Sequence, residues 1–274
     1  MTGPARRNGV DIRIGGITVR LRNSDQAFLR MLDERYAAFM VNGGGEPDYR
    51  FDVELAPPRS QPLDDGDDDD DVRVWPSDGW WHLKRGDFRA GWDRASRQGY
   101  IRQDANPYSL DTVLRIVHTL VLAGEGGFLI HAASAVRSGK AFIFTGVSGA
   151  GKTTLSRLAP PDAHVLTDEI SYLRKEGGRY VAYGTPFAGE LARAGENLRA
   201  PLEAIYLLTQ GPENRITDVD KAEAARTLLR NLLFFAEDPQ LVQTVFLAAL
   251  DLVEQVPVRR LTFLPEPGAW NLIQ

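Results

Sequence analysis

An apolar run that leads straight into a glycine-rich loop constrains this chain more than any other feature. The run Ala141-Phe142-Ile143-Phe144 precedes Gly146-Val147-Ser148-Gly149-Ala150-Gly151-Lys152-Thr153, and this loop meets the spacing G-x-x-x-x-G-K-[ST] in full. A short helix is expected next, because Pro160-Pro161 stops it a few residues after Thr154. The order strand, loop, helix predicts an α/β domain whose loop surrounds a phosphate group.

The residue types in this loop suit a nucleoside triphosphate that is bound with Mg²⁺. Glycines let successive backbone N–H groups turn inward around a phosphate, and Lys152 adds a mobile positive charge. The hydroxyl of Thr153 can bind a Mg²⁺ ion that bridges two phosphates. The alternative, a glycine-rich turn with a stray lysine, is disfavoured by the position between a strand and a helix. We therefore expect nucleotide contacts from Gly146, Ser148, Gly149, Ala150, Gly151, Lys152, Thr153 and Thr154.

Two adjacent acids follow the next apolar strand. Residues 165–167 are expected to form this strand, and Asp168-Glu169 stands at its end. In phosphoryl transfer one carboxylate can hold Mg²⁺ and another can accept the proton of the attacking hydroxyl. A helix-capping Asp or a solvent-facing Glu is the alternative, and the spacing alone does not assign the two roles.

A histidine lies in an apolar run upstream of the loop. His131 stands within residues 128–136, and residues 141–144 form the second strand of a predicted hairpin. A lone histidine in an apolar strand is more often a core residue than a catalytic one. On the residues alone we therefore expect His131 to belong to the core.

The chain divides into two predicted domains, residues 1–105 and residues 106–274. In the first, alternation of apolar and polar residues predicts a hairpin, a further strand and a meander of short strands. Ser24 is expected to cap the helix between the hairpin and the next strand. The expected elements are strands at 10–14, 17–21 and 49–55, short strands between 72 and 103, and a helix over 107–122.

The second domain continues with alternating strand and helix patterns. After the acidic pair, two strands flank Gly177-Gly178 as a hairpin. A buried strand, two amphipathic helices and a last strand follow. The expected ranges are 170–173, 179–183, 204–208, 221–235, 239–253 and 258–263.

Residues 57–71 are rich in aspartate, with Pro57-Pro58 at one end. Mutual repulsion and the lack of apolar side chains predict a disordered surface loop. A calcium site is the alternative, but the spaced ligand pattern of a calcium loop is missing. Four tryptophans of the meander form either a recognition platform or, as we expect for most of them, part of the packing of the sheet: Trp75, Trp80, Trp81 and Trp92.

Composition excludes several other classes. The net charge of −5 argues against a broad nucleic-acid surface, and no apolar stretch is long enough to span a membrane. The chain has no cysteine, so disulfides and thiolate sites are excluded. Residues 1–8 carry two arginines without an apolar segment behind them, so we expect no secretory signal. A cytoplasmic protein is the expectation.

Three segments together resemble a known family. Leu129-Ile130-His131-Ala132-Ala133, the hairpin into the glycine-rich loop, and Val165-Leu166-Thr167-Asp168-Glu169 resemble the C-terminal catalytic domain of HPr kinase/phosphorylase. They are more similar still to HPr-kinase-like proteins of bacterial gene clusters, including kinases that act on lasso peptide precursors. The resemblance covers residues 127–189, and its antiparallel lead-in to the loop is shared with phosphoenolpyruvate carboxykinase. It implies an α/β fold: a P-loop kinase domain of the HPr kinase / PEP carboxykinase type, preceded by a small strand-rich α+β N-terminal domain.

The resemblance also implies roles for individual residues. His131 becomes an active-site residue beside the transferred phosphate, and Lys152 and Thr153 match directly. Asp168 matches the catalytic acid, the base for an acceptor serine. Glu169 matches a second acid, Asp in the family, that is associated with Mg²⁺. The implied cofactors are ATP and Mg²⁺.

One position departs from the family pattern. Val147 stands where HPr kinases usually carry Asp, and the later loop segment associated with reversal of the reaction has no clear match. A one-way kinase with another acceptor is therefore expected.

The acceptor and the partners stay open at this point. The expected reaction is transfer of the γ-phosphate to a hydroxyl, with a serine of a peptide or small protein as the main candidate. A small-molecule hydroxyl kinase and a nucleotide-binding regulatory protein with little catalysis are the alternatives. Neither nucleic acid nor a membrane is expected as a partner. Oligomers are frequent in the family, so the resemblance allows a homo-oligomer.

Two further sequence features are candidates near the active site. Residues 183–190 are punctuated by Gly and Pro and are expected to form a loop over the active site, with Glu190 near the metal. A plain connecting loop is the alternative. Arg193, Arg199 and Arg215 are candidate phosphate contacts.

Overall fold

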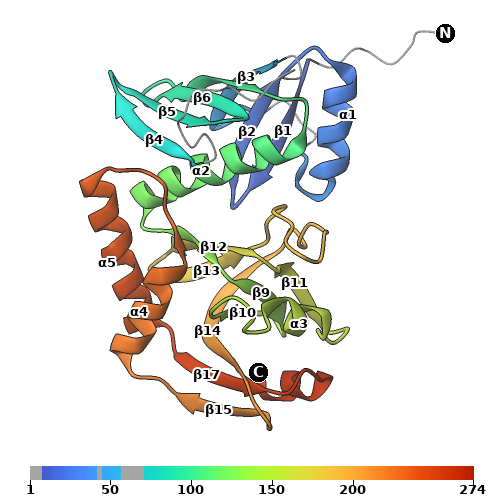
Figure 1. Ribbon diagram of the computed structural model, residues 1–274, viewed down its shortest axis with the longest axis vertical. Helices are drawn as coiled ribbons and strands as arrows, with labels where there is room; N and C mark the ends of the chain where they lie inside the picture. The colour runs from blue at the N-terminus through green and yellow to red at the C-terminus, as the bar shows by residue number, and fades with distance from the viewer. Residues whose placement is uncertain (1–7, 42–44, 57–70) are drawn as a thin grey trace, which may run out of the picture. The chain divides into compact units, whose positions relative to one another are not determined.

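The computed structural model describes residues 8–41, 45–56 and 71–274 (Figure 1). The chain forms two compact units. Unit 1 comprises Met1–Val117 and Phe235–Asp238, and unit 2 comprises His118–Phe234 and Pro239–Gln274. Most of the predicted loop at 57–71 lies outside the described residues.

Unit 1 contains a seven-stranded sheet in the order β1-β2-β3-β7-β6-β5-β4 (Figure 1). β3 pairs in parallel with β2 and with β7, and the other neighbours are antiparallel. The predicted hairpin and the predicted antiparallel meander are both present. The elements are β1 (Gly9–Ile14), β2 (Ile17–Arg22), α1 (Gln26–Arg35), η1 (Ala37–Phe39), β3 (Tyr49–Leu55), β4 (Arg73–Ser77), β5 (Trp80–Arg85), β6 (Phe88–Asp93) and β7 (Gln98–Gln103).

The cap of helix α1 differs from the prediction. Asp25, not Ser24, caps the helix, because its carboxylate stands directly before the first turn and accepts hydrogen bonds from two backbone N–H groups there. These donors are Ala27 N at 2.7 Å and Phe28 N at 3.0 Å. Sequence preference does not separate Ser from Asp at this position, so the geometry of the turn decides.

Unit 2 is built on a mixed ten-stranded sheet. Its main path has the order β11-β9-β10-β14-β13-β12-β8-β16, while β17 pairs with β14 and β15. The helix α2 (Pro107–Glu125) belongs partly to each unit. The remaining elements are β8 (Phe128–His131), β9 (Ala133–Arg137), β10 (Lys140–Thr145), α3 (Lys152–Arg157), β11 (Ala163–Thr167), β12 (Ile170–Glu176), β13 (Arg179–Tyr183), β14 (Arg199–Gln210), β15 (Arg215–Asp218), α4 (Lys221–Asn231), β16 (Leu232–Leu233), α5 (Pro239–Gln255), β17 (Val258–Phe263) and η2 (Pro267–Leu272).

Three strands of unit 2 bring their carboxyl ends to one edge of the sheet. β10 and β14 are parallel neighbours, and β9 is antiparallel to both β10 and β11. β10, β11 and β14 therefore run in the same direction. The edge at which parallel strands end is where open α/β sheets bind ligands.

The predicted strand over 128–136 is interrupted at Ala132. β8 ends at His131 and pairs with β12 and β16, whereas β9 begins at Ala133 and pairs with β10 and β11. The chain thus passes from one half of the sheet to the other within a single apolar run. Pairing partners far away in the sequence cause this break, so local composition does not reveal it.

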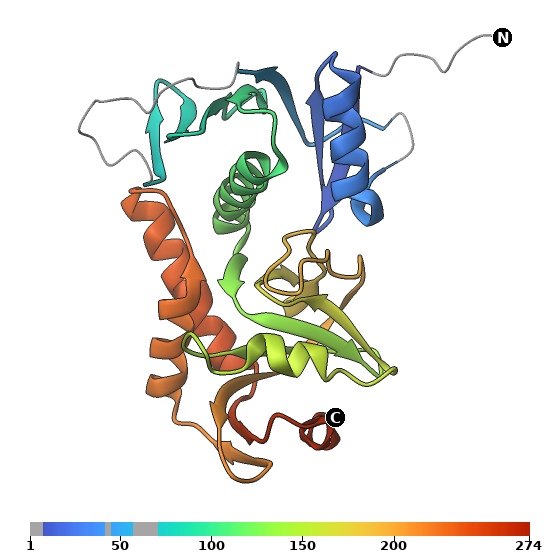
Figure 2. The same cartoon turned by 45° about the vertical axis from the view of Figure 1, so that its right-hand side comes forward.

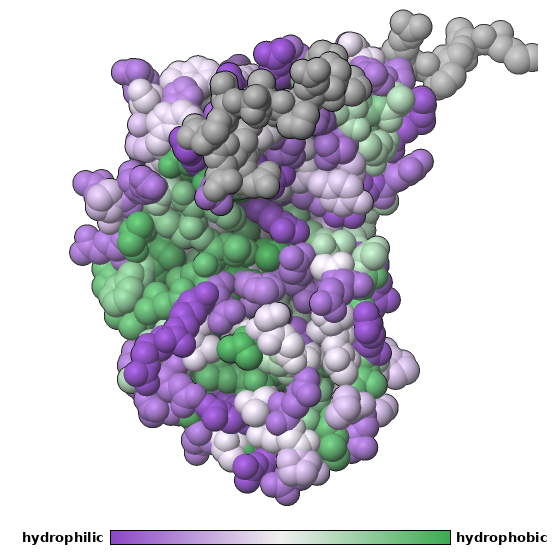
Figure 3. Space-filling model, in the orientation of Figure 1, coloured by the Kyte–Doolittle hydropathy of each residue, from purple (hydrophilic) through white to green (hydrophobic). Residues whose placement is uncertain are grey.

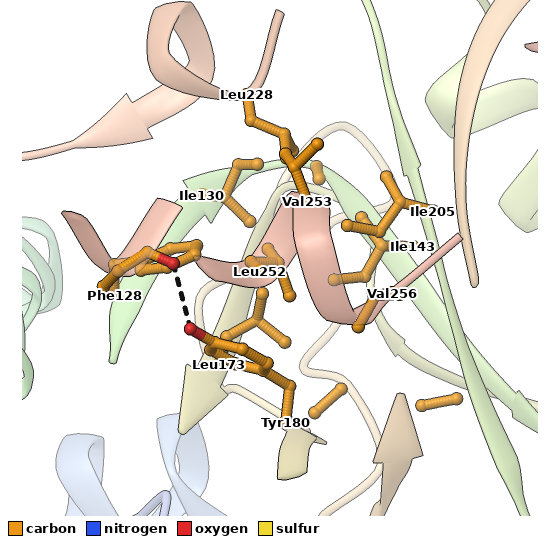
Figure 4. Packing of buried hydrophobic residues seen from close by; sticks show 14 of the residues in the cluster. Phe128, Ile130, Ile143, Leu173, Tyr180, Ile205, Leu228, Leu252, Val253 and Val256 are labelled. Atoms are coloured by element: carbon orange, nitrogen blue, oxygen red, sulfur yellow. Dashed lines mark hydrogen bonds between the residues drawn. The ribbon is translucent and has the colours of Figure 1, made fainter. Parts of the chain in front are cut away.

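Helices cover both faces of this sheet (Figures 1 and 2). On one face, apolar side chains of α4 and α5 pack against the strands, as Figure 4 shows for Leu228, Leu252 and Ile143. On the other face, Leu155 of α3 and Trp270 of η2 pack in a second cluster. The sheet is therefore buried on both sides.

The predicted helix over 221–235 ends earlier than expected. α4 stops at Asn231, because Leu232 takes an extended conformation and pairs with Ile130 of β8. The tertiary pairing overrides the helical pattern of the sequence.

The helix α5 has an apolar patch at its surface (Figure 3). Val242, Phe246, Leu247 and Leu250 are exposed there. Within the described residues no helix is long and apolar enough to cross a membrane.

Candidate active site

The glycine-rich loop connects the end of β10 to the start of α3. Gly149 and Gly151 have φ values of +77° and +105°, in the left-handed region that glycine adopts without strain. A Cβ at Gly151 would also lie 2.5 Å from Cζ of Phe263, so the loop packs closely on β17. The loop therefore needs glycine at these positions for its shape.

Lys152 lies at the base of the loop and is buried, with 8% of its surface exposed. Its Nζ donates a hydrogen bond to the carbonyl of Gly146 at 3.3 Å. Burial lowers the pKa of Lys152, and the nearby carboxylates of Glu190 and Glu169 oppose this shift. Lys152, Glu169 and Glu190 line the same pocket, and the two carboxylates favour the charged ammonium group.

The acidic pair forms a tight turn between β11 and β12. Oγ1 of Thr167 accepts hydrogen bonds from the backbone N–H groups of Glu169 and Ile170, each at 3.1 Å. Asp168 is buried, and Glu169 is partly buried. These bonds fix the backbone of the turn, which places both acidic residues at the strand end where the sequence predicts them.

The carboxylate of Asp168 is held by a second segment of backbone. Its Oδ1 accepts from Gly189 N at 3.0 Å, and its Oδ2 accepts from Leu191 N at 2.9 Å. A carboxylate has about four acceptor positions, so two bonds still leave it capacity for another partner. Asp168 therefore joins the acidic turn to the segment that carries Glu190.

The segment around Gly189 lies against β11 through backbone hydrogen bonds. Thr185 N donates to Leu166 O at 3.1 Å, and Glu196 N donates to Val165 O at 2.9 Å. A Cβ at Gly189 would lie 2.8 Å from Oδ2 of Asp168, which leaves no room for a side chain. Glycine at this position allows the segment to approach the acidic turn closely.

These elements enclose one polar pocket of about 570 Å³. The predicted residues His131, Lys152, Thr153, Asp168 and Glu169 all line it. The full lining is His131, Ser148, Gly149, Gly151, Lys152, Thr153, Thr154, Asp168, Glu169, Ala188, Gly189, Glu190 and Gln210. The pocket thus combines the glycine-rich loop, one lysine and three acidic side chains.

His131 is exposed at the end of β8, which contradicts the core position favoured by the residues alone. Its place in the sheet explains this, because it pairs with Ile170 directly beside the acidic turn. Two predicted contact residues do not line the pocket. Gly146 approaches Ala150 and Leu208 at the base of the loop, and Ala150 is buried.

The candidate arginines are also absent from the pocket lining. Arg199 pairs with Glu176, and Arg215 lies 3.4 Å from Glu213. Arg193 is exposed. None of the three contributes to the pocket as the structure stands.

Gln210 is a pocket residue that sequence reasoning missed. It ends β14, and its Nε2 donates to the carbonyl of Gly149 at 2.8 Å. Its only sequence signal is a polar residue after the apolar run at 204–208. That β14 lies beside β10 is a matter of topology, and no local pattern shows it.

Fold and pocket together define the class: a mixed α/β protein with a polar pocket at the carboxyl ends of its strands, lined by a glycine-rich loop and an acidic turn. Residues 101–265, more than half of the chain, match the family described as SynChlorMet cassette protein ScmC. The chain belongs to this ScmC family.

Comparison with solved structures finds a weak similarity, and comparison with curated proteins finds none. The solved structure of the Hpr(Ser) kinase/phosphatase from Coxiella burnetii is similar with 13% sequence identity, over 44% of this chain and 87% of that chain, at a TM-score of 0.24.

Proposed function

We propose that this chain is an ATP- and Mg²⁺-dependent kinase of the HPr-kinase-like type, which transfers the γ-phosphate to a hydroxyl group. The acceptor is a serine of a peptide or small protein. One observation carries this proposal: the glycine-rich loop, Lys152, Thr153 and the acidic pair converge on one pocket with His131. Positioning and charge supply most of the catalysis in phosphoryl transfer, and this pocket offers both.

The chemistry of the pocket fits a metal that is bound through phosphates. Within the described residues no group of three or more His, Cys, Asp or Glu side chains could hold a metal ion by itself. Mg²⁺ typically takes one or two carboxylates, waters and substrate phosphates instead of a complete protein cage. Thr153 and Glu169 would hold the ion, with Glu190 close by, and the ion would neutralise charge on the phosphates.

The other residues have distinct roles in this proposal. Lys152 neutralises the outer phosphates, and the backbone of the glycine-rich loop holds them in place. Asp168 orients the acceptor hydroxyl and accepts its proton, because its carboxylate is fixed by two backbone hydrogen bonds. His131 lies beside the transferred phosphate and orients it.

One observation favours a second candidate, a nucleotide-binding regulatory protein with little catalysis. Val147 is 79% exposed at the start of the loop, where it adds an apolar side chain and no charge. Tight binding of Mg²⁺-ATP without hydrolysis or transfer to any acceptor would support this candidate over the kinase. A small-molecule acceptor remains an alternative within the kinase proposal, and a substrate screen separates the two.

The test of the kinase proposal is the variant Asp168→Asn. We expect phosphate transfer from labelled ATP to a serine-containing peptide library to fall by about 100-fold or more, since a general base contributes at least that much. ATP affinity should change little, because Asp168 is not assigned to the nucleotide. Asp162→Asn is the matched control, since Asp162 is exposed and pairs with Arg137. Transfer by the Asp168 variant at the wild-type rate would contradict the assignment.

A further inference from the structure

The sheet of unit 1 has one buried face and one open face. Along β7, Ile101 and Gln103 are buried, whereas Tyr100 and Arg102 between and beside them are exposed. In β4 and β5 the residues on this side of the sheet are exposed or partly buried, while Val74, Trp81 and Leu83 on the other side are buried. In β6, between β5 and β7, Arg89 is exposed and Phe88 and Ala90 are buried, so the open face continues across these four strands. The side chains on this face are not used by the candidate active site.

Four aromatic rings lie together on the open face, and we name them the aromatic stripe: Trp75, Trp80, His82 and Tyr100. His82 stacks on Trp75 with ring centroids 5.6 Å apart and on Trp80 at 6.4 Å. Trp80 and Tyr100 are also 6.4 Å apart. Trp75 and Tyr100 are 42% and 44% exposed, so the stripe presents apolar surface to solvent.

A glycine at the centre lets this stripe continue across β6. Gly91 pairs with His82 on one side and with Tyr100 on the other. A Cβ there would lie 3.4 Å from Cε1 of Tyr100 and 3.5 Å from Nδ1 of His82. Both rings therefore lean over the backbone of Gly91, and little separates the two halves of the stripe.

Four basic side chains run beside the stripe, and we name them the basic row: Arg73, Lys84, Arg89 and Arg102. They are successive register partners in β4, β5, β6 and β7. Trp75, His82, Gly91 and Tyr100 are also successive register partners. In each strand the basic residue lies two positions from one of them. Side chains two positions apart in a strand point to the same side, so the basic row and the aromatic stripe occupy the same face. Residues two apart in a strand are about 7 Å apart, which is the separation of row and stripe.

We propose that the aromatic stripe and the basic row form a docking surface for an extended acidic peptide segment. In an extended chain, alternate side chains point to opposite sides. A peptide that crosses the strands between row and stripe can therefore direct acidic residues to the row and apolar residues to the stripe. Four adjacent strands span about 14 Å, and three acidic residues at every second position span about 13 Å.

The charge around the surface favours a short peptide over a nucleic acid. Asp52 pairs with Tyr100 in register, Asp93 pairs with Trp80, and Glu54 lies 3.4 Å from Arg102. These acids lie beside the basic row and the aromatic stripe on two sides. A long polyanion would be repelled by these carboxylates, whereas a short acidic segment fits between them.

This docking surface goes beyond phosphoryl transfer and does not depend on it. If the proposed kinase function holds, the bound segment belongs to the acceptor. Because peptide binding is measured without nucleotide, its failure is distinguishable from a failure of the kinase proposal.

The experiment uses the full chain and a fluorescein-labelled nine-residue peptide of alternating Glu and Tyr, with fluorescence anisotropy as the readout. We expect saturable binding that weakens with added salt, and no binding of the peptide with Lys in place of Glu. Arg89→Ala combined with Arg102→Ala should weaken binding at least tenfold. Trp75→Ala should weaken it about fivefold.

Matched controls come from elsewhere in unit 1. Arg30→Ala removes an exposed arginine of α1, and Tyr108→Ala removes an aromatic side chain that is 69% exposed. Both should bind the peptide like the wild type, and circular dichroism should show that all variants are folded.

Three outcomes would overturn the proposal. The first is equal peptide affinity in the wild type and in both docking-surface variants. The second is binding of a twelve-residue oligo-dT without binding of the acidic peptide. The third is peptide binding only after the aspartates of residues 64–70 are replaced by asparagine, which would assign the surface to the chain's own acidic run.

Discussion

The geometry of the acidic pair depends on the small size of Gly189. Its N–H binds Asp168, and a side chain there would collide with Asp168 and with Cβ of Glu169, each at 2.8 Å. Neither group is the far end of a long flexible side chain, so both acids would have to move. Small displacements of catalytic groups are costly in rate.

Gly189→Ala should therefore lower phosphate transfer by about 10- to 100-fold while the protein stays folded. Gly124→Ala is the control, because no heavy atom lies within 4 Å of a Cβ at that position of α2. The control should be neutral or more stable by up to about 1 kcal/mol, since Ala favours helix. Transfer rates and urea unfolding measure both effects, and a fully active Gly189 variant would show that the acids tolerate displacement.

The pocket residues differ in how far the sequence could predict them. Lys152 and Thr153 belong to a contiguous motif, and Asp168 follows a recognisable strand, so local patterns are sufficient. His131 needed the family resemblance, because an apolar neighbourhood alone indicates a core residue. Neither local patterns nor the family resemblance identified Gln210, since its contact with Gly149 depends on two strands that are far apart in sequence.

At the scale of elements, alternation and turn residues predicted most strands. The ranges 49–55 and 258–263 agree with β3 and β17. The break at Ala132 and the end of α4 were missed, because non-local pairing determines both. β14 is longer than predicted, since Pro201 reads as a strand breaker but is accepted within the pairing with β13.

The contact between α2 and β12 contains a buried histidine. Nδ1 of His118 lies 3.2 Å from Oη of Tyr172, and burial lowers the pKa of His118 to about 3. In the unfolded chain the pKa of histidine is about 6.5. Below that pH the unfolded state binds a proton that the folded state does not, so the free energy of unfolding decreases as pH falls.

We therefore expect the free energy of unfolding to drop by about 1 kcal/mol per pH unit between pH 6 and pH 4 from this residue. His118→Gln keeps a hydrogen-bonding group for Tyr172 without a titrating ring, so this part of the pH dependence should disappear. His164→Gln, at an exposed histidine, is the control. Urea unfolding between pH 6 and pH 4 measures this pH dependence. If the free energy of unfolding changed with pH equally in the wild type and in the His118 variant, His118 would not be a neutral buried residue.

At the scale of the whole molecule, the chain combines a strand-rich unit with a mixed α/β unit. The two compact units part within α2, between Val117 and His118. The predicted division into two independent domains, residues 1–105 and residues 106–274, stays a prediction. In our proposals unit 2 binds the nucleotide and performs the transfer, and unit 1 binds a peptide segment.

Isothermal titration calorimetry of the full chain with ATP at millimolar Mg²⁺ measures binding at the glycine-rich loop without any assumption about the acceptor. We expect one ATP site per chain, with affinity at least tenfold weaker in Lys152→Ala and unchanged in Lys140→Ala, whose lysine is exposed and pairs with Glu203. No binding of ATP or GTP by the wild type, or equal affinity in Lys152→Ala, would contradict a phosphate site at the glycine-rich loop.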